Sequence, residues 1–259
     1  MQTLLADPKP TVGFVIGTFA AVPYIHLHLE SRRRSYPEVP VLVCDDGSLR
    51  GQELADLCER YGAEFWTRPA RLAPTLGDLA AVATGMEWAE KRRIEILVKF
   101  SRRFLPLGSW VESLGSLAYA AQDATYGGEC RDFGFPLRTE SVGYHVPSWI
   151  AAGGLTGIRC AVAAGQYQFV EDFLYDLAVQ VKTQCVSSSR GDELSEASSA
   201  VRHWPMLGRG RLERRQEFLW HDLDTPVDYA RIARLWDLPY GVEDFADPNM
   251  GEGDGTGEV

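Results

Sequence analysis

The sequence lacks a long apolar run, an excess of basic charge and a paired-cysteine motif. No apolar segment reaches the roughly 20 residues of a membrane-spanning helix. The N-terminus lacks the basic-then-apolar order of a signal peptide. The 36 acidic side chains outnumber the 26 basic ones, giving a net charge of −10, whereas general nucleic-acid binding requires a basic face. We therefore expect neither a membrane span nor a nucleic-acid partner.

The five cysteines are widely spaced and form no Cys-x-x-Cys pair. An odd number leaves one cysteine over in any disulfide scheme, so we expect a reducing cytoplasm and thiols that act mainly as small core residues. Apolar residues, in contrast, are plentiful: the 259 residues are 45% hydrophobic and include seven Trp. That supply is sufficient for one large domain with a full core.

The rest of the chain is organised around a valine-rich run that stops at Asp45-Asp46-Gly47-Ser48. The run, from Val39 to Cys44, has the continuous apolar pattern of a strand that is buried on both faces. Ser48 is a good N-cap residue for a following helix, with Gly62 as its stop signal. The carboxylates then lie at the carboxyl end of a strand, where open α/β sheets bind their ligands. The alternative is a solvated Asp-Gly turn.

Further strands and helices alternate along the first part of the chain. Buried strands are predicted at 11–17 and 94–100, a short strand at 64–66, and helices at 23–34 and 75–93. In the second of these helices, Thr75 and Asp78 have the spacing of a capping box, and an apolar stripe follows at helical spacing. Alternating strands and helices are typical of a parallel sheet with helices on its faces. We therefore predict an α/β fold with a mainly parallel central sheet.

A group of basic residues closes the predicted strand at 94–100. Lys99, Arg102 and Arg103 lie close together in an otherwise acidic chain. Such a group indicates either a surface turn or an anion-binding site, and the sequence leaves both interpretations open.

The second half of the chain shows weaker patterns. The expected features are a helix at 110–122, strands and long loops at 126–149, a glycine cluster at 153–157, a helix at 168–181, a mobile loop at 187–199 and a disordered acidic tail at 247–259. The glycine cluster is too irregular for a dinucleotide-binding or P-loop fingerprint. The helix at 168–181 carries Glu171-Asp172 near its start. We find no internal repeat.

The order of these features resembles the GT-A family of glycosyltransferases, over residues 11–182. A first strand ends near Thr18, and a second ends in Asp45-Asp46-Gly47-Ser48. Another strand then occupies the place of the metal-binding motif of that family, and a glycine-rich segment precedes the helix with Glu171-Asp172. The resemblance implies a GT-A-like α/β domain over 1–246, with a nucleotide-sugar-binding half at 11–106 and an acceptor half at 107–246.

The resemblance also implies that the donor is a UDP-sugar. Carried over to this sequence, Thr18 and either Asp45 or Asp46 meet the uracil and the ribose of UDP. The chemistry agrees, because a carboxylate accepts hydrogen bonds from the uracil N–H and from ribose hydroxyls. The acceptor, whether a glycan, a lipid or a protein, is not specified by the sequence.

The chain departs from the family where an Asp-x-Asp motif holds Mn²⁺ or Mg²⁺ against the diphosphate. Counting back from Pro106, the corresponding positions hold Lys99, Ser101 and Arg102, which offer a hard divalent cation almost no carboxylate oxygen. In one hypothesis, Lys99, Arg102 or Arg103 replaces the charge of the metal on the diphosphate. In the other, the protein has lost catalysis and only binds a nucleotide or nucleotide sugar.

An inverting transferase needs a carboxylate that deprotonates the acceptor hydroxyl. Asp172 is the first candidate for this general base and Glu171 the second, although either can instead simply stabilise the start of its helix. A retaining enzyme needs neither. A nucleotidyltransferase, whose sheet order is related, is a third hypothesis. It is disfavoured because no glycine-rich, lysine-containing loop follows the first strand.

Overall fold

The structure is a computed structural model that describes residues 11–102, 104–107, 125–130, 135–165, 170–188, 202–203, 218–220 and 225–246. Several sequence-based expectations fall outside these ranges. They are the cation at Arg103, the helix at 110–122, nearly all of the loop at 187–199 and the tail at 247–259.

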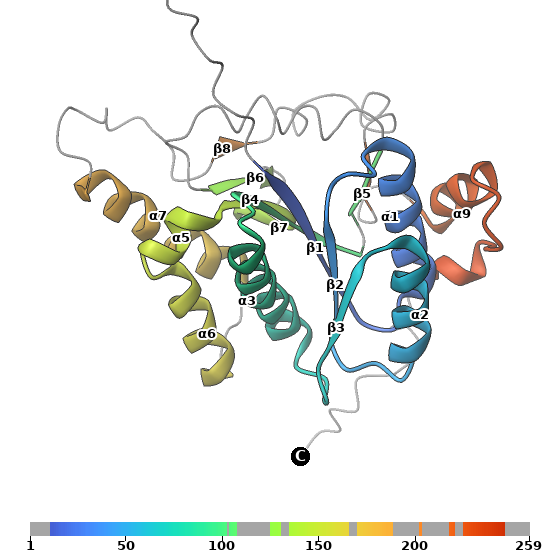
Figure 1. Ribbon diagram of the computed structural model, residues 1–259, viewed down its shortest axis with the longest axis horizontal. Helices are drawn as coiled ribbons and strands as arrows, with labels where there is room; N and C mark the ends of the chain where they lie inside the picture. The colour runs from blue at the N-terminus through green and yellow to red at the C-terminus, as the bar shows by residue number, and fades with distance from the viewer. Residues whose placement is uncertain are drawn as a thin grey trace, which may run out of the picture.

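Within the described residues, the centre of the molecule is a seven-stranded mixed sheet (Figure 1). Its strands, in spatial order, are β3 (Glu64–Thr67), β2 (Val41–Asp45), β1 (Val12–Thr18), β4 (Ile96–Ser101), β7 (Phe135–His145), β6 (Thr125–Cys130) and β8 (Arg202–His203). The first four run parallel, β7 runs antiparallel to β4 and β6, and β8 runs parallel to β6. The predicted α/β fold with a mainly parallel sheet is confirmed.

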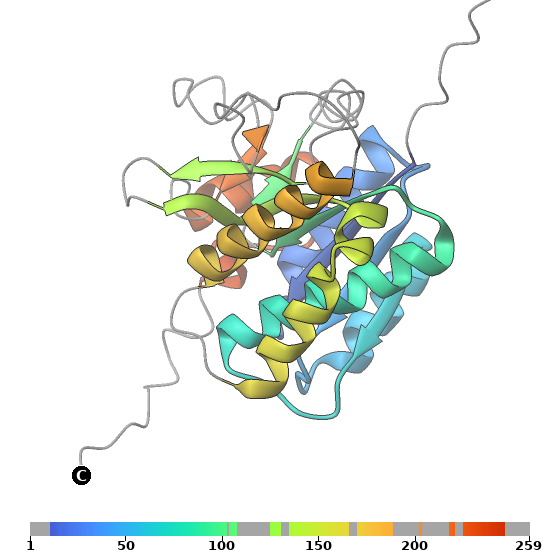
Figure 2. The same ribbon diagram turned by 90° about the vertical axis from the view of Figure 1, so that its left-hand side faces the viewer.

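Helices cover both faces of this sheet. One face carries α1 (Val22–Ser35) and α2 (Gly51–Tyr61), and the other carries α3 (Pro74–Arg92), α5 (Val146–Ala151), α6 (Gly154–Ala164) and α7 (Val170–Ser188). Figure 2 shows α3, α6 and α7 side by side. Beyond α1 lie β5 (Phe104–Pro106), β9 (Phe218–Trp220), α9 (Pro226–Leu235) and the 3₁₀ turn η2 (Glu243–Phe245). In the described part of the chain, no helix is long and apolar enough to cross a membrane.

The side chains of the parallel strands alternate between two apolar cores. Phe14 and Val98 pack with α1 and α2, whereas Val15 and Leu97 pack with α3 and α7. All four side chains are buried. Burial on both faces explains why these strands have continuous apolar sequences rather than alternating ones.

Two predicted helix caps are wrong. Ser48 does not cap α2, whose N-cap is Arg50. The backbone N–H of Ser48 instead donates to Asp45 Oδ2 at 2.9 Å. Thr75 and Asp78 form no capping box in α3, which begins after Ala73 without a side-chain cap. The Asp78 carboxylate is bound to Lys99 instead, because a buried ammonium without an anionic partner is very unfavourable.

In the second half, the glycine cluster at 153–157 forms the start of α6, where Gly153 adopts a left-handed conformation with φ of 76°. The helix predicted at 168–181 is present as α7 and extends further. Strands were predicted correctly within 126–149, but the expectation of loops there is wrong for Trp149. That residue is fully buried in α5 and packs against Tyr144.

Candidate functional site

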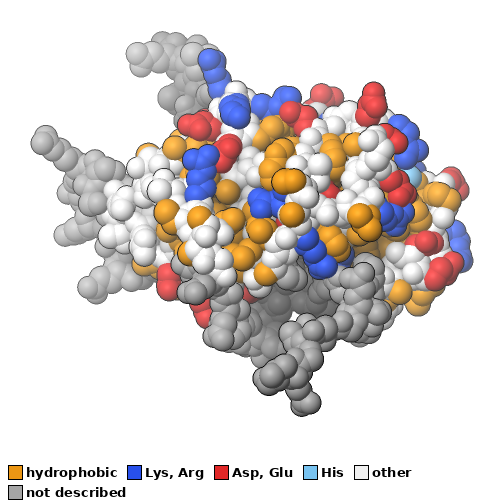
Figure 3. Space-filling model, turned by 90° about the horizontal axis from the view of Figure 1, so that it is seen from below, with side chains coloured by type: hydrophobic (Ala, Val, Ile, Leu, Met, Phe, Trp, Pro, Cys, Tyr) orange, Lys and Arg blue, Asp and Glu red, His pale blue; other side chains and the backbone are white. Residues whose placement is uncertain are grey.

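The carboxyl ends of β1, β2, β3 and β4 lie along one edge of the sheet, which we call the carboxyl edge. The strands end there at Thr18, Asp45, Thr67 and Ser101. In the sheet, Thr18 is the direct neighbour of Asp45, and Gly17 is the neighbour of Ser101. Figure 3 looks onto this side of the molecule and shows Lys and Arg side chains among hydrophobic ones. The strand register therefore gathers Thr18, Asp45 and Ser101 at one edge.

Asp45 is the last residue of β2 and is buried, with 1% of its surface exposed. Its Oδ2 accepts hydrogen bonds from the Ser48 backbone N–H and the Thr67 hydroxyl, both at 2.9 Å. Its Oδ1 is buried and accepts no hydrogen bond from any described residue, and the hydroxyls of Thr18 and Ser48 are also without described partners. Buried polar atoms without partners are rare and mark positions where water or a ligand binds. Three such oxygens lie together here.

Asp46 has a different environment, because it holds two loops together. Its carboxylate accepts the Leu72 backbone N–H at 3.2 Å and pairs with Arg68 at 3.5 Å. Burial raises the pKa of Asp46, against the hydrogen bond from Leu72 and the charges of Arg68 and Arg71. The sequence left open whether Asp45 or Asp46 meets a ligand. Of the two, Asp45 has the buried oxygen that no described group engages.

Gly47 allows the loops after β2 and β3 to approach each other closely. Its φ is +74°, and a Cβ at this position would lie 2.8 Å from the Ala70 carbonyl carbon and 2.9 Å from the Arg71 nitrogen. Glycine alone adopts this conformation without steric cost. The Asp-Gly turn is thus a packed contact between two loops, and the alternative of a solvated turn does not hold.

Gly47→Ala is expected to destabilise the protein much more than Gly62→Ala. Both glycines have left-handed backbones, for which a non-glycine residue costs about 1–2 kcal/mol. An added Cβ meets nothing within 4 Å at Gly62, whereas at Gly47 it meets backbone atoms. Urea unfolding of both variants measures the difference. Equal losses of stability would show that the two loops separate easily.

Arginines from two loops, those after β3 and β4, also lie at the carboxyl edge. The Arg71 guanidinium stacks on Phe19, 3.7 Å from the ring centroid, and Arg102 donates to the Phe19 carbonyl at 3.1 Å. Among the described residues, no carboxylate pairs with Arg71. Arg68 and Arg71 were missed by the sequence analysis. Their position directly after β3 was the available signal, since parallel strands end at the same edge.

Lys99 lies inside β4 rather than after it, between Val15 of β1 and Val142 of β7. It is 1% exposed, and its Nζ lies 2.7 Å from Asp78 Oδ2. The expectation that three cations follow the strand is therefore wrong for Lys99, which lies within β4. Lys99 belongs to the core, Arg102 follows the strand, and Arg103 is outside the described residues.

No protein-family model and no curated protein matches this sequence. Among solved structures, TarS of S. aureus superposes with a TM-score of 0.51 at 9% identity, over 87% of this chain and 39% of TarS. The fold is GT-A-like. A mannosyltransferase from Pyrobaculum calidifontis, solved with GDP-Man and Mn²⁺, gives a TM-score of 0.44 at 16% identity, over 57% of this chain and 48% of that one.

A cytidylyltransferase from Leptospira borgpetersenii gives a TM-score of 0.49 at 12% identity and covers 90% of both chains. The structures to which this chain is similar thus include a mannosyltransferase and a cytidylyltransferase. This chain spans less than half the length of TarS and of the mannosyltransferase. At such identities the likeness concerns the fold alone.

The residues that the GT-A resemblance assigns to the metal-binding motif do not fit a divalent cation. Lys99 and Arg102 are cationic, and Ser101 offers one hydroxyl, whereas Mn²⁺ and Mg²⁺ require several oxygen ligands, carboxylates among them. Within the described ranges, no group of three or more His, Cys, Asp or Glu side chains could hold a metal ion.

Glu171 and Asp172 lie in the first turn of α7; Asp172 is exposed and Glu171 is half-buried. The helix runs antiparallel to α6, because Gly157 approaches Leu177 and Gly154 approaches Val181. Within the described residues, no hydrogen bond or ion pair engages Asp172. An exposed carboxylate without a partner can accept a proton from an incoming hydroxyl.

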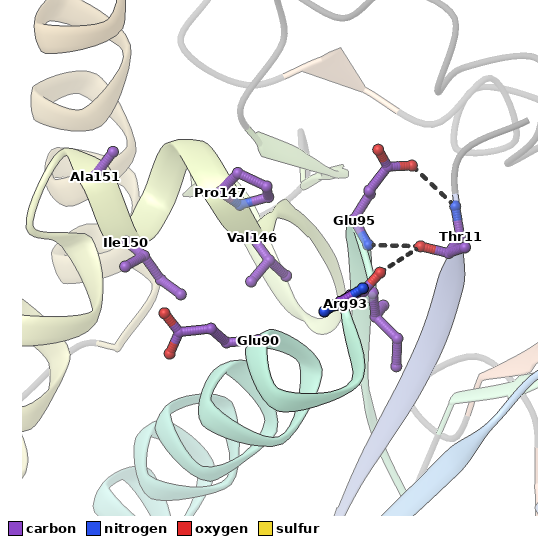
Figure 4. Close-up of a pocket in the computed structure, with 9 residues that line it drawn as sticks. Thr11, Glu90, Arg93, Glu95, Val146, Pro147, Ile150 and Ala151 are labelled. Atoms are coloured by element: carbon purple, nitrogen blue, oxygen red, sulfur yellow. Dashed lines mark hydrogen bonds between the residues drawn. The ribbon is translucent and has the colours of Figure 1, made fainter. Parts of the chain in front are cut away.

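A pocket of about 640 Å³ lies at the opposite edge of the sheet, where β1 and β4 begin (Figure 4). Apolar side chains of Ile94, Val146 and Ile150 line it, and Glu90 points toward Ile150. Thr11 closes one side, where its hydroxyl donates to the Arg93 carbonyl at 2.9 Å. None of the residues predicted from the sequence for ligand binding or catalysis lines this pocket.

Proposed function

We propose that this protein is a glycosyltransferase that binds a UDP-sugar and transfers the sugar to an acceptor. The observation that carries the proposal is the group of buried, unpartnered oxygens of Thr18, Asp45 and Ser48 at the carboxyl edge. Uracil presents an N–H between two carbonyl oxygens. A carboxylate accepts from that N–H, and two hydroxyls can donate to the carbonyls. The three protein groups therefore complement a uracil ring.

In this proposal, the basic side chains at the carboxyl edge bind the diphosphate of the UDP-sugar. Arg71 stacks on the ring of Phe19, directly after β1, and Arg102 donates to the Phe19 carbonyl. Ser101 adds a hydroxyl that has no partner among the described residues, and Arg103 is the next residue along the chain. Guanidinium groups bind phosphate oxygens strongly and can stand in for a metal. Lys99 reaches the diphosphate only by leaving Asp78.

The acceptor is a hydroxyl of a glycan, a lipid or a protein, and Asp172 is its proposed general base, with Glu171 as the second candidate. The free thiols of Cys44 and Cys58, both buried, support a reducing, cytoplasmic location. We also infer a relationship with majastridin, a GT-A-like protein encoded near bacterial ATP synthase genes, which the overall sequence resembles.

A second candidate function is nucleotide-sugar binding without catalysis. It is favoured by the ion pair of Lys99 with Asp78, which stands where the family carries its metal-binding motif. The two functions differ in turnover. Release of UDP from a bound UDP-sugar, with water or added sugars as acceptor, would exclude the binding-only function.

The deciding experiment is calorimetric titration of the protein with UDP, first in EDTA and then with excess Mn²⁺. We expect binding in EDTA that Mn²⁺ leaves unchanged, because the arginines supply the positive charge. Binding only with Mn²⁺ would contradict the metal-independent site. If UDP binds under neither condition, the proposed function is excluded, whereas the assignment of the fold is unaffected.

A matched pair of ligands tests the basic groups. Arg102→Ala is expected to lower the affinity for UDP by about tenfold, the usual effect of losing a hydrogen bond to a charged group. The affinity for uridine, which lacks the diphosphate, should change little. Equal losses for both ligands would show that Arg102 acts only through the Phe19 carbonyl that it binds.

A further inference from the structure

The ion pair between Lys99 and Asp78 connects the core to the surface. Lys99 is 1% exposed and lies in the middle of the sheet, whereas the Asp78 side chain is 33% exposed. The 2.7 Å contact uses Oδ2 of Asp78. The other oxygen, Oδ1, accepts no hydrogen bond from a described residue. One oxygen of this carboxylate is thus fixed by the core and the other is available.

The backbone of β1 leaves space for the available oxygen. A Cβ added at Gly17 would lie 3.3 Å from Asp78 Oδ1 and 3.3 Å from Ala81 Cβ. Oδ1 therefore lies directly over the last residues of β1, one position before Thr18. The absence of a side chain at Gly17 allows this approach. Asp78 therefore lies at the carboxyl edge on the α3 face of the sheet, whereas Thr18 and Asp45 occupy strand positions that face α1 and α2.

Two hydroxyls on the same face of the sheet have no described partner. Tyr144 is fully buried, and its hydroxyl makes no hydrogen bond with any described residue. Burial raises the pKa of Tyr144, and the nearby Asp78 carboxylate raises it further. Ser101, next to Gly17 in the sheet, has an unpartnered Oγ as well. Buried hydroxyls without partners near a carboxylate mark a position where water or a ligand binds.

We propose that Asp78 is a specificity-determining residue that recognises sugar hydroxyls of the nucleotide sugar, on its ribose or on its hexose. A carboxylate oxygen accepts from hydroxyls in short, charge-assisted hydrogen bonds. Such a site rejects analogues that lack the hydroxyl, because its polar groups are then left unpaired. The proposal rests on the proposed function and adds to it a carboxylate that the family resemblance did not supply.

Lys99 is a positioning residue in this arrangement. Its ammonium holds Asp78 Oδ2 and so directs Oδ1 toward the ligand. A diphosphate is repelled by the Asp78 carboxylate, so Lys99 serves the sugar through Asp78 rather than the phosphates directly. This role differs from the one that the sequence indicated, in which Lys99 replaced the metal.

The test compares ligands that differ by hydroxyl groups, by calorimetry on the full chain. The ratio of the affinities for UDP and for 2′,3′-dideoxyuridine diphosphate measures the contribution of the ribose hydroxyls. The ratios of the affinities for UDP-glucose or UDP-galactose and for UDP measure the contribution of the hexose hydroxyls. In the wild type, we expect one of these affinity ratios to be at least fivefold. Asp78→Asn should bring that ratio close to one and leave the other unchanged. Asp56→Asn, at an exposed residue of α2, is the matched control.

Because Asp78→Asn leaves a buried ammonium with a neutral partner, that variant risks unfolding. The double variant Asp78→Asn with Lys99→Met removes both charges and should show the same loss of discrimination. Ratios that stay at the wild-type value in both variants overturn the proposal while the proposed function stands. A wild type that binds none of these nucleotides overturns both.

Lys99→Met alone separates the two roles of the lysine. We expect weaker discrimination between the hydroxyl-containing and hydroxyl-lacking ligands, with the affinity ratio of UDP to uridine unchanged. A fall in the ratio of UDP to uridine would show that Lys99 binds the diphosphate and would overturn its positioning role.

Discussion

Asp45→Asn is expected to weaken the binding of both UDP and uridine by roughly tenfold to a hundredfold, since a hydrogen bond to a charged group contributes about 1.5–3 kcal/mol. The asparagine oxygen can still accept from the Ser48 N–H and the Thr67 hydroxyl. Its amide nitrogen, however, replaces the unpartnered Oδ1 and donates where the carboxylate accepts. Titration calorimetry with the two ligands measures the loss, which should be equal because the contact is to the base.

Thr67→Val is the control for this experiment. It removes one hydrogen bond to Asp45 Oδ2 and leaves Oδ1 untouched. We expect a stability loss of about 1 kcal/mol and a nucleotide affinity within twofold of the wild type. If Thr67→Val lowered the affinity for uridine as much as Asp45→Asn does, the loss would be caused by a change in the geometry of the turn and not by the loss of Oδ1.

The position of this site was predictable because it follows from local patterns. A continuous apolar run marks a strand buried on both faces, and the residues after it must lie at the edge of the sheet. Asp45 and Asp46 were placed there on that ground. Their different roles were not predictable. The partners that distinguish them, Thr67 at the end of β3 and Leu72 in the loop after it, are more than twenty residues away in the sequence.

The ion pair of Lys99 with Asp78 shows the opposite situation, in which a local pattern misled. Thr75 and Asp78 have the spacing of a capping box, and Lys99 stands in a basic segment that resembles a surface turn. A strand position that faces α3 buries the lysine instead, and a buried ammonium requires an anion. The nearest carboxylate on α3 is then used for pairing rather than for capping. Only the packing of α3 on β4 determines this choice.

Asp172→Asn is expected to lower the rate of sugar transfer by about 10²- to 10⁴-fold, the usual contribution of a general base. The affinity for UDP should stay unchanged, because the base contacts the acceptor and not the nucleotide. The substitution keeps the size of the side chain at an exposed position, and the loss of one charge in the first turn costs α7 only about 0.3–1 kcal/mol. The rate of UDP release from the UDP-sugar that binds best, with water as acceptor, measures the effect.

Asp176→Asn provides the comparison, since Asp176 is exposed one turn further along the same helix. It removes the same charge from α7 and should leave the rate unchanged. A wild-type rate in Asp172→Asn would exclude Asp172 as the base and direct the same experiment to Glu171. Equal rate losses in Asp172→Asn and Asp176→Asn would mean that the negative charge of α7, and not proton transfer at one residue, supports turnover. Because the nucleotide affinity is measured separately, neither outcome affects the assignment of the uridine site at the carboxyl edge.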